Sequence, residues 1–298
     1  MSEVVVDEQP EAPTRPALRY HGAKWILSSW IISCLPLDHD SYIEPFGGSA
    51  AVLLNKRRSA LEAYNDLDGD VVNFFQVLRE REEELIRAIY WTPFAHAEQR
   101  LSMEPTDDPL ERARRLYVRS HLTISGPTAQ WNSGWRRQKV FSRGRGGWSR
   151  MKPAAASFME TEHLYQVAER LRGVIIEQSD ALEVIRRYDN ARALFYVDPP
   201  YVATTRKRWP ASAYRYEMTD EQHHELADVL HACRGMIALS GYDSPLYQEL
   251  FGDWQRLERQ VRTNGNSEQM ATESLWLNPA AQIALERQQL PLFYRGDV

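Results

Sequence analysis

The stretch SYIEPFGGSAAVLLNK, residues 41–56, indicates the fold class of this chain. It begins as a short strand, turns at two glycines and continues as an apolar helix from about Ser49. A second strand at 61–66 and an amphipathic helix from Gly69 repeat the same order. Two successive strand–helix units predict an α/β protein whose strands run parallel.

The same alternation returns in the second half of the chain. Helices and strands are expected in turn there, over residues 163–171 (helix), 173–178 (strand), 181–188 (helix), 193–198 (strand), 219–233 (helix) and 235–240 (strand). Two further strands, at 255–262 and 273–278, complete the predicted sheet. We therefore expect a Rossmann-like sheet with helices on both faces.

Residues 91–157 interrupt this rhythm with a segment rich in glycine, arginine and tryptophan. We interpret them as an insertion, mostly helical and loop, between two parts of one α/β domain at 17–90 and 158–298. Residues 1–16 carry three prolines and several acids without periodicity. We expect them to be a disordered lead-in on which nothing structural depends.

Composition favours a soluble, cytoplasmic protein with a large core, since 43% of the 298 residues are hydrophobic. No run approaches the roughly 18 apolar residues that cross a bilayer, and no signal peptide is evident. Cys34 and Cys233 are the two cysteines of the chain, so neither a disulfide framework nor a metal site is predicted. His223 and His224 lie in a charged helix and are expected to face solvent.

The positive charge of the chain is concentrated in one segment. The net charge of −5 on its own argues against a polyanion as partner. Residues 112–159, however, hold 11 lysines or arginines and no acid, whereas the rest of the chain holds 25 basic and 41 acidic residues. The segment is either a nucleic-acid contact or a solvated basic loop.

Ligands of an open parallel sheet bind beyond the carboxyl ends of its strands, so residues just after each strand are the candidates. Gly47 and Gly48 allow close approach of the backbone to a ligand, or they form a plain turn capped by Ser49. Asp66 can accept the two hydroxyls of a ribose or cap the next helix. Asp180 can contact the base of a cofactor, although helix capping is its simpler role.

The stretch FYVDPPYV, residues 195–202, follows the most apolar of these strands. Asp198 leaves the sheet, Pro199 and Pro200 stiffen the chain, and Tyr201 comes next. The carboxylate and the carbonyl of Pro199 can accept both hydrogens of an aromatic amine, while the tyrosine ring stacks on it. Taken alone, the stretch also fits a proline-rich loop that ends a strand.

These motifs together resemble the Dam-type (D12 class) DNA N6-adenine methyltransferases, which use S-adenosylmethionine. The similarity spans about Arg19 to Pro279. Four stretches match in order: RYHGAK at 19–24, EPFGGSA at 44–50, YNDLD at 64–68 and DPPY at 198–201. His21, Ala23 and Ala50 depart from the family pattern, which commonly has glycine or another small residue there.

The resemblance implies a role for each matching position. The methionine end of S-adenosylmethionine would contact Tyr20, Gly22 and Lys24, and its pocket would be lined by Phe46, Gly47 and Gly48. Asp66 would hold the ribose, and Asp180 would lie near the cofactor adenine. The catalytic motif is Asp198, Pro199, Pro200 and Tyr201, which would hold the target adenine, with Asp198 also facing the cofactor. No metal is required, and we assign no raised pKa to Asp198.

The resemblance also implies that residues 91–157 recognise double-stranded DNA, because a base must be flipped out of the duplex to reach such a pocket. The residues expected to neutralise phosphates are Arg136, Arg137, Lys139, Arg143, Arg145, Arg150 and Lys152. Aromatic side chains expected to wedge or stack where the base leaves are Trp131, Trp135, Phe141 and Trp148.

Three alternatives to a DNA adenine methyltransferase stay open from the sequence. A cytosine-N4 enzyme presents the same exocyclic amine to the same kind of site. An RNA adenine-N6 enzyme needs no other residues. A protein that keeps the fold but has lost turnover would act as a DNA-binding module. The sequence does not determine the recognition site or the oligomeric state.

Overall fold

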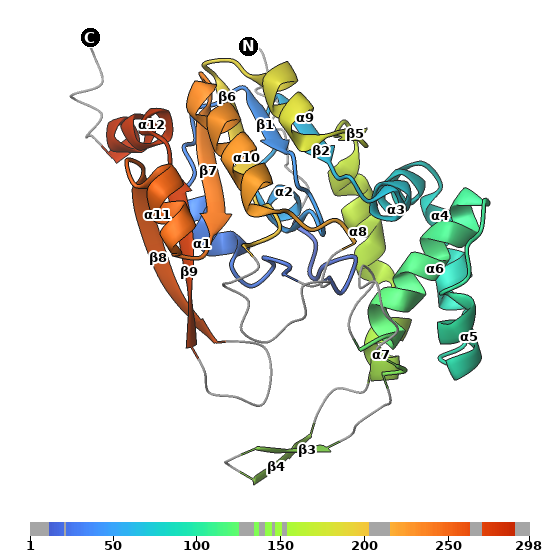
Figure 1. Cartoon of the computed structure of the whole chain (residues 1–298). Coiled ribbons are helices and arrows are strands. Elements are labelled where there is room, and N and C mark those ends of the chain that lie inside the picture. Colours follow the sequence, from blue (N-terminus) through green and yellow to red (C-terminus); the bar gives the residue numbers. More distant parts are fainter. Residues whose placement is uncertain are drawn as a thin grey trace, which may run out of the picture.

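The computed structural model describes residues 12–20, 22–124, 134–136, 141–144, 147–150, 154–202, 215–262 and 270–289. Within these residues, the centre of the molecule is a seven-stranded sheet in the order β5-β2-β1-β6-β7-β9-β8 (Figure 1). Its strands are β1 (Ser41–Glu44), β2 (Leu61–Asn65), β5 (Ile175–Glu177), β6 (Ala193–Val197), β7 (Met236–Gly241), β8 (Gln255–Arg262) and β9 (Met270–Leu277).

The direction of the strands changes at one edge of the sheet. The five strands from β5 to β7 pair in parallel, as the alternation of strands and helices predicts. β9 pairs antiparallel with both β7 and β8. The α/β fold and its Rossmann-like sheet are thereby confirmed. The sheet is mixed because β9, the next strand after β8 in the chain, runs antiparallel to β8 and inserts between it and β7.

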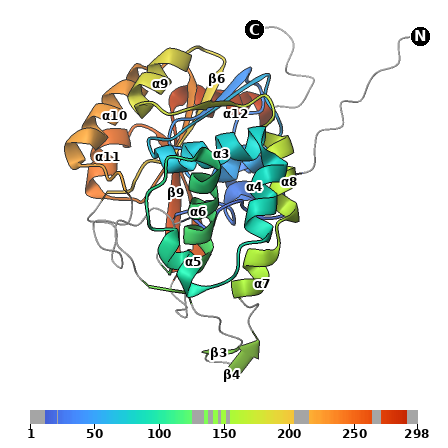
Figure 2. The same ribbon diagram turned by 90° about the vertical axis from the view of Figure 1, so that its right-hand side faces the viewer.

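Helices cover both faces of this sheet, as expected (Figures 1 and 2). Successive residues of a strand point to opposite faces, so Tyr42 belongs to one buried cluster and Ile43 to the other. One face packs against α1 (Ser28–Ser33), α2 (Ala51–Asn55), α3 (Gly69–Glu80), α8 (Glu162–Leu171) and α12 (Pro279–Gln289). The other packs against α9 (Ala181–Tyr188), α10 (Asp220–Ala232) and α11 (Pro245–Phe251).

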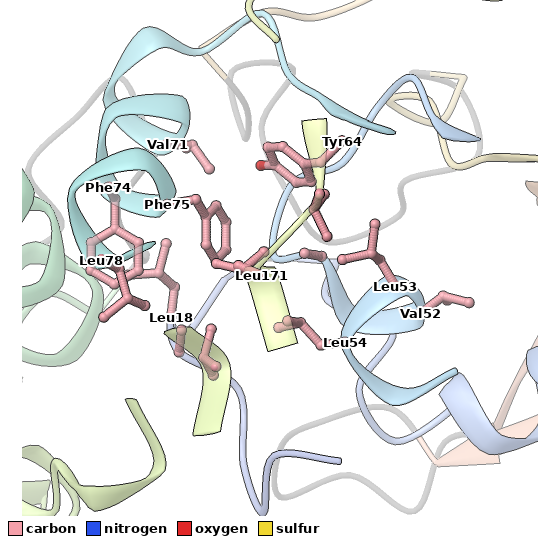
Figure 3. Close-up of a cluster of buried hydrophobic side chains, with 14 of the residues drawn as sticks. Leu18, Val52, Leu53, Leu54, Tyr64, Val71, Phe74, Phe75, Leu78 and Leu171 are labelled. Carbon is pink, nitrogen blue, oxygen red and sulfur yellow. The ribbon is translucent and has the colours of Figure 1, made fainter. Parts of the chain in front are cut away.

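The larger of the two clusters joins the sheet to its first helices. Tyr64 of β2 stacks edge-on against Phe75 of α3, with ring centroids 5.1 Å apart (Figure 3). Leu171 of α8 and Leu18 of the N-terminal segment lie in the same cluster. Burial of these large apolar side chains fixes β2, and with it Asp66, against the helices on this face.

The predicted insertion contains α5 (His96–Leu101), α6 (Pro109–Leu122), the hairpin strands β3 (Phe141–Gly144) and β4 (Gly147–Arg150), and the start of α7 (Ala154–Met159). α6 packs against α3 and against α4 (Glu82–Tyr90), and its buried side chains belong to the core of the sheet domain. The hairpin extends beyond α7, away from the sheet (Figures 1 and 2). The boundaries at residues 91 and 157 remain predictions.

Three details differ from the sequence-based expectations. α2 is preceded by Ala50 in the left-handed conformation, and no side chain caps it, so Ser49 is not its cap. Arg15 pairs with Glu160 at 2.6 Å, so the expectation that nothing structural depends on residues 1–16 is wrong for Arg15. His223 is buried rather than exposed, because its ring packs against Tyr247 in the core.

No helix in the described ranges is long and apolar enough to cross a membrane. Within those ranges, no group of three or more His, Cys, Asp or Glu side chains is arranged to hold a metal ion.

Candidate active site

A cavity of about 200 Å³ opens at the carboxyl ends of β1, β2 and β6. This is the edge where an open parallel sheet binds its ligands. Residues from all four sequence motifs line it: Tyr20, Gly22, Lys24, Phe46, Gly47, Gly48, Asp66, Asp180, Asp198, Pro199 and Pro200. The structure therefore brings every predicted cofactor residue to one place, together with three residues of the DPPY motif.

The glycine turn between β1 and α2 forms one wall of the cavity. A Cβ atom on Gly47 would lie 2.1 Å from the ring of Tyr64, which excludes any side chain at this position. Gly48 has a φ of 48°, a conformation that side chains disfavour. The Tyr64 hydroxyl donates to the carbonyl of Gly48 at 2.7 Å and holds the turn against β2. The glycines are thus required by the packing of the turn as well as by access to the cavity.

Asp66 ties this turn to the start of α3. Its Oδ2 accepts a hydrogen bond from the amide of Gly48 at 2.8 Å, and its Oδ1 accepts one from the amide of Asp68 at 2.8 Å. Loss of solvent around the carboxyl group raises its pKa to about 6, although the hydrogen bonds from the backbone amides lower it. Asp68 and not Asp66 caps α3, because the Asp68 carboxylate accepts from the amide of Asp70.

Asp180 has the capping role that its sequence position allows. Its carboxylate accepts from the amides of Leu182 and Glu183 at 2.9 and 3.2 Å, at the start of α9. The same side chain lies on the wall of the cavity. Its contact with a cofactor base therefore remains a prediction, while the cap is confirmed.

Lys24 and Asp198 connect the first motif to the fourth. The ammonium of Lys24 donates to both carboxylate oxygens of Asp198, at 2.9 and 3.0 Å, and to the carbonyl of Gly22 at 3.1 Å. Burial raises the pKa of Asp198, and the charge of Lys24 opposes that rise. From the sequence we assign no raised pKa to Asp198, but the burial of its carboxyl group after β6 shifts that pKa upward.

Tyr201 lies beside this ion pair rather than on the cavity wall. The ammonium of Lys24 is 4.7 Å from the centre of the Tyr201 ring, within the range of a cation–π contact. The ring meets Tyr242 edge-on at 4.7 Å, and its hydroxyl donates to Glu273 Oε2 at 3.0 Å. A buried ammonium, a carboxylate and an oriented aromatic ring are thus assembled next to a glycine-lined cavity.

Comparison with known proteins agrees with this arrangement. Residues 20–264 match the family model described as D12 class N6 adenine-specific DNA methyltransferase. The chain belongs to this family. A DNA adenine methylase of Haemophilus influenzae is 22% identical over 257 residues, which cover 82% of this chain and 85% of that protein. Membership supports adenine in DNA over the cytosine, RNA and inactive alternatives.

Sequence reasoning overlooked a buried carboxyl group of this methyltransferase. Glu44 Oε1 accepts from the Tyr42 hydroxyl at 2.8 Å and from the amide of Leu53 at 2.6 Å, and the side chain lines the cavity. Burial raises the pKa of Glu44 to about 8, which favours the protonated form of this carboxyl group. Its position at the carboxyl end of β1 could have identified Glu44 as a candidate from the sequence, because ligands of an open parallel sheet bind there.

A cluster of ion pairs also joins the cavity of the methyltransferase to α6. Arg215, on the cavity wall, donates to Asp68 at 3.0 Å and to Asp70 at 3.2 Å. Arg112 and Arg119 of α6 donate to the same Asp70 carboxylate, at 2.6 and 2.8 Å. No pattern in the sequence paired these residues, because the partners come from three distant segments.

The predicted DNA-binding residues of the methyltransferase are only partly described. Arg136 is half-buried, and its guanidinium donates to the carbonyl of His121 at 3.4 Å. Arg143 and Arg150 lie on β3 and β4, where the structure gives the backbone. The other predicted phosphate ligands lie outside the described residues: Arg137, Lys139, Arg145 and Lys152.

The base of the insertion is held by the first motif. Thr123 forms a bridge with Trp135, and Arg19 donates to the carbonyl of Thr123 at 3.1 Å. Arg19 immediately precedes Tyr20 of the cavity wall. Of the predicted wedge residues, Trp135 packs against the core, Phe141 and Trp148 have only their backbones described, and Trp131 lies outside the described residues.

Proposed function

We propose that this DNA adenine methyltransferase takes its methyl group from S-adenosylmethionine, bound in the cavity beyond β1, β2 and β6. The residues present fit such a ligand. The backbone turn at Gly47 and Gly48 lines the cavity, and Asp66 offers carboxylate oxygens about 20 residues further on, as nucleoside-binding sites do. The cofactor residues are those expected: Tyr20, Gly22, Lys24, Phe46, Gly47, Gly48, Asp66, Asp180 and Asp198.

When bound, the cofactor supplies an electrophilic methyl group attached to a positively charged sulfur. The task of the protein is to make the adenine amine a better nucleophile, because its lone pair is delocalised into the ring. Asp198 and the carbonyl of Pro199 accept the two N6 hydrogens and localise that lone pair. Tyr201 stacks on the base, and Pro200 fixes the backbone between them. Positioning of the two reactants supplies much of the acceleration.

The target adenine is proposed to leave a DNA duplex before it reaches Asp198. Flipping costs a few kcal/mol, which stacking on Tyr201 partly recovers. Residues 91–157 provide the basic surface that binds the flanking phosphates, including Arg136, Arg137, Lys139, Arg143, Arg145, Arg150 and Lys152. The contact of Arg19 with Thr123 supports a link between this region and the cavity.

The observation that carries the proposal is that one cavity collects the glycine turn, Asp66 and Asp198. To test it, the purified chain is incubated with S-adenosylmethionine and mixed-sequence duplex DNA, and the digested nucleosides are identified by mass spectrometry. N6-methyldeoxyadenosine from wild type and none from Asp198→Ala is the expected result. N4-methyldeoxycytidine, or a product only on RNA, would contradict the proposed substrate, and no product on either would contradict turnover itself.

A further inference from the structure

Glu273 is a buried carboxylate of the active site that belongs to none of the four motifs. It lies near the start of β9 and is 8% exposed. In the sheet, the next residue of β9, Ser274, pairs with Gly241 at the end of β7. Since β9 runs antiparallel to β7, its first residues reach the edge where the parallel strands end. Glu273 thereby comes to the catalytic side of the sheet.

The contacts of Glu273 suit a residue that fixes the side chain of Tyr201. Its Oε2 accepts the Tyr201 hydroxyl at 3.0 Å. Burial raises the pKa of Glu273, and the nearby charge of Lys24 lowers it. A buried carboxylate costs free energy unless hydrogen-bond donors and an opposite charge compensate it. An apolar residue at position 273 would serve the backbone pairing of β9 equally well, so strand pairing does not explain the glutamate.

The Tyr201 ring needs such an anchor. Pro199 and Pro200 restrict the backbone that leads to Tyr201, but they do not fix the two side-chain torsions of the tyrosine. The edge-on contact with Tyr242 fixes one side of the ring, and the hydrogen bond to Glu273 fixes its far end. Without Glu273, the ring can turn away from the plane in which a base stacks.

We propose that Glu273 is a positioning residue for methyl transfer: it holds the Tyr201 hydroxyl and thereby orients the ring on which the target adenine stacks. The inference rests on the proposed role of Tyr201. Glu273 itself touches neither the base nor the methyl group in this scheme.

The kinetic test compares Glu273→Ala, Glu273→Gln and Tyr201→Phe by transfer of a tritiated methyl group to DNA that lacks adenine methylation. Glu273→Ala should lower kcat by about tenfold to a hundredfold with an unchanged KM for S-adenosylmethionine. Glu273→Gln keeps an acceptor oxygen and should recover most of kcat. Combined with Tyr201→Phe, Glu273→Ala should add no further loss, because both remove one hydrogen bond.

Glu258→Ala is the matched control, since it removes a carboxylate from the exposed face of the neighbouring strand β8. A wild-type kcat in Glu273→Ala, or losses that multiply in the double variant, would overturn the proposal. Thermal unfolding of each variant separates loss of folding from loss of positioning.

A second measurement does not depend on turnover. The chain is labelled with 3-fluorotyrosine, and the ¹⁹F resonance of Tyr201 is assigned by its absence in Tyr201→Phe. This resonance should shift in Glu273→Ala and stay in place in Glu258→Ala. An unmoved resonance overturns the positioning role, whereas a wild-type chain that makes no N6-methyladenine overturns the proposed function. The two failures are therefore distinguishable.

Discussion

The ammonium of Lys24 lies 2.9 Å from one carboxylate oxygen of Asp198 and 3.0 Å from the other, across 174 positions of sequence. Both groups are shielded from water, with 6% of the lysine side chain and 19% of the aspartate side chain exposed. In such surroundings an ion pair decides whether the carboxyl group is charged. Lys24 thus controls the charge of the carboxyl group that we propose as acceptor for the adenine amine.

We predict that Lys24→Met moves the acid limb of the activity profile to higher pH. Burial raises the pKa of Asp198 and Lys24 lowers it, so loss of the lysine leaves the upward shift unopposed. A protonated Asp198 is uncharged and accepts the hydrogen of the adenine amine more weakly than the carboxylate does. Activity therefore falls as Asp198 is protonated. The measurement is kcat/KM from about pH 5 to about pH 9. Lys24→Arg keeps the positive charge, so its acid limb should lie at the same pH as that of wild type. Coincident pH profiles for wild type and Lys24→Met would contradict the prediction.

Asp66 should make cofactor affinity depend on pH. Its pKa is raised to about 6 by loss of solvent, so the carboxylate that we propose to accept the ribose hydroxyls is protonated as pH falls below that value. The KM for S-adenosylmethionine should therefore rise as pH drops through about 6. Asp66→Ala should raise that KM by about tenfold or more at neutral pH, because it also leaves the amides of Gly48 and Asp68 without their acceptor.

Asp189→Asn is the control for Asp66. Asp189 likewise accepts two backbone amides, those of Arg234 and Gly235, but it does not line the cavity. The variant should leave the KM for S-adenosylmethionine and its pH dependence unchanged. If Asp189→Asn and Asp66→Ala act alike, the effect is a loss of folding rather than of a ribose contact.

The left-handed conformation of Ala50 should offset the usual loss of stability when glycine replaces alanine at a helix. Its φ of 55° is left-handed, which costs a residue with a Cβ about 1 kcal/mol or more. Ala50→Gly relieves this cost but loosens the unfolded chain and removes a buried methyl group, so the free energy of unfolding should change by less than about 0.5 kcal/mol. Ala51→Gly, one residue into α2, should lower it by about 1 kcal/mol. Urea unfolding of both variants checks the contrast, and equal losses would refute it.

Local patterns predicted the parallel part of the fold because each of its strands and helices carries its own periodicity. β6 and α10, for instance, are buried along a whole strand and along one helical face. The place of the four motifs at one cavity was also predictable, since each directly follows a parallel strand or precedes the first one. Their convergence on one cavity needs only the rule for open sheets.

Glu273 and Asp70 were not predictable by that reasoning. Glu273 stands at the beginning of an antiparallel strand, whereas the rule for open parallel sheets points only to residues just after strands. Asp70 looks like a first-turn acid of α3, and its contacts with Arg112 and Arg119 depend on how α6 packs. Packing between segments far apart in sequence leaves no local pattern to recognise.

A buried ion cluster between α8 and β2 should contribute strongly to stability. Arg170 of α8 donates two hydrogen bonds to Glu62 of β2, at 2.6 and 2.9 Å, and Lys56 donates a third at 2.8 Å. Arg170→Met leaves the buried Glu62 carboxylate with Lys56 and the amide of Ser59 as partners, and should lower the free energy of unfolding by about 3 kcal/mol. Arg172→Met breaks an exposed pair with Glu169 and should cost less than about 1 kcal/mol. Equal midpoints in urea for the two variants would contradict this assignment.

The basic segment predicts how DNA affinity depends on salt. Each phosphate contact contributes roughly 0.9 to the slope of log affinity against log salt concentration, so changing Arg136, Arg137 and Arg143 to Ala should flatten the slope by up to about 3. Arg136 also donates to the carbonyl of His121, so its loss can loosen the base of the insertion as well as remove a charge.

Two variants separate these contributions. Arg136→Lys keeps the charge and changes the geometry of the contact, so it should leave the slope near that of wild type even if affinity falls. Arg172→Ala removes an exposed arginine outside the segment and should leave both slope and affinity unchanged. Binding is measured by fluorescence anisotropy of a labelled duplex over a range of salt concentrations. A slope that the triple change does not alter would place the phosphate-binding surface elsewhere, because counterion release follows the contacts that are made and not the overall charge of −5.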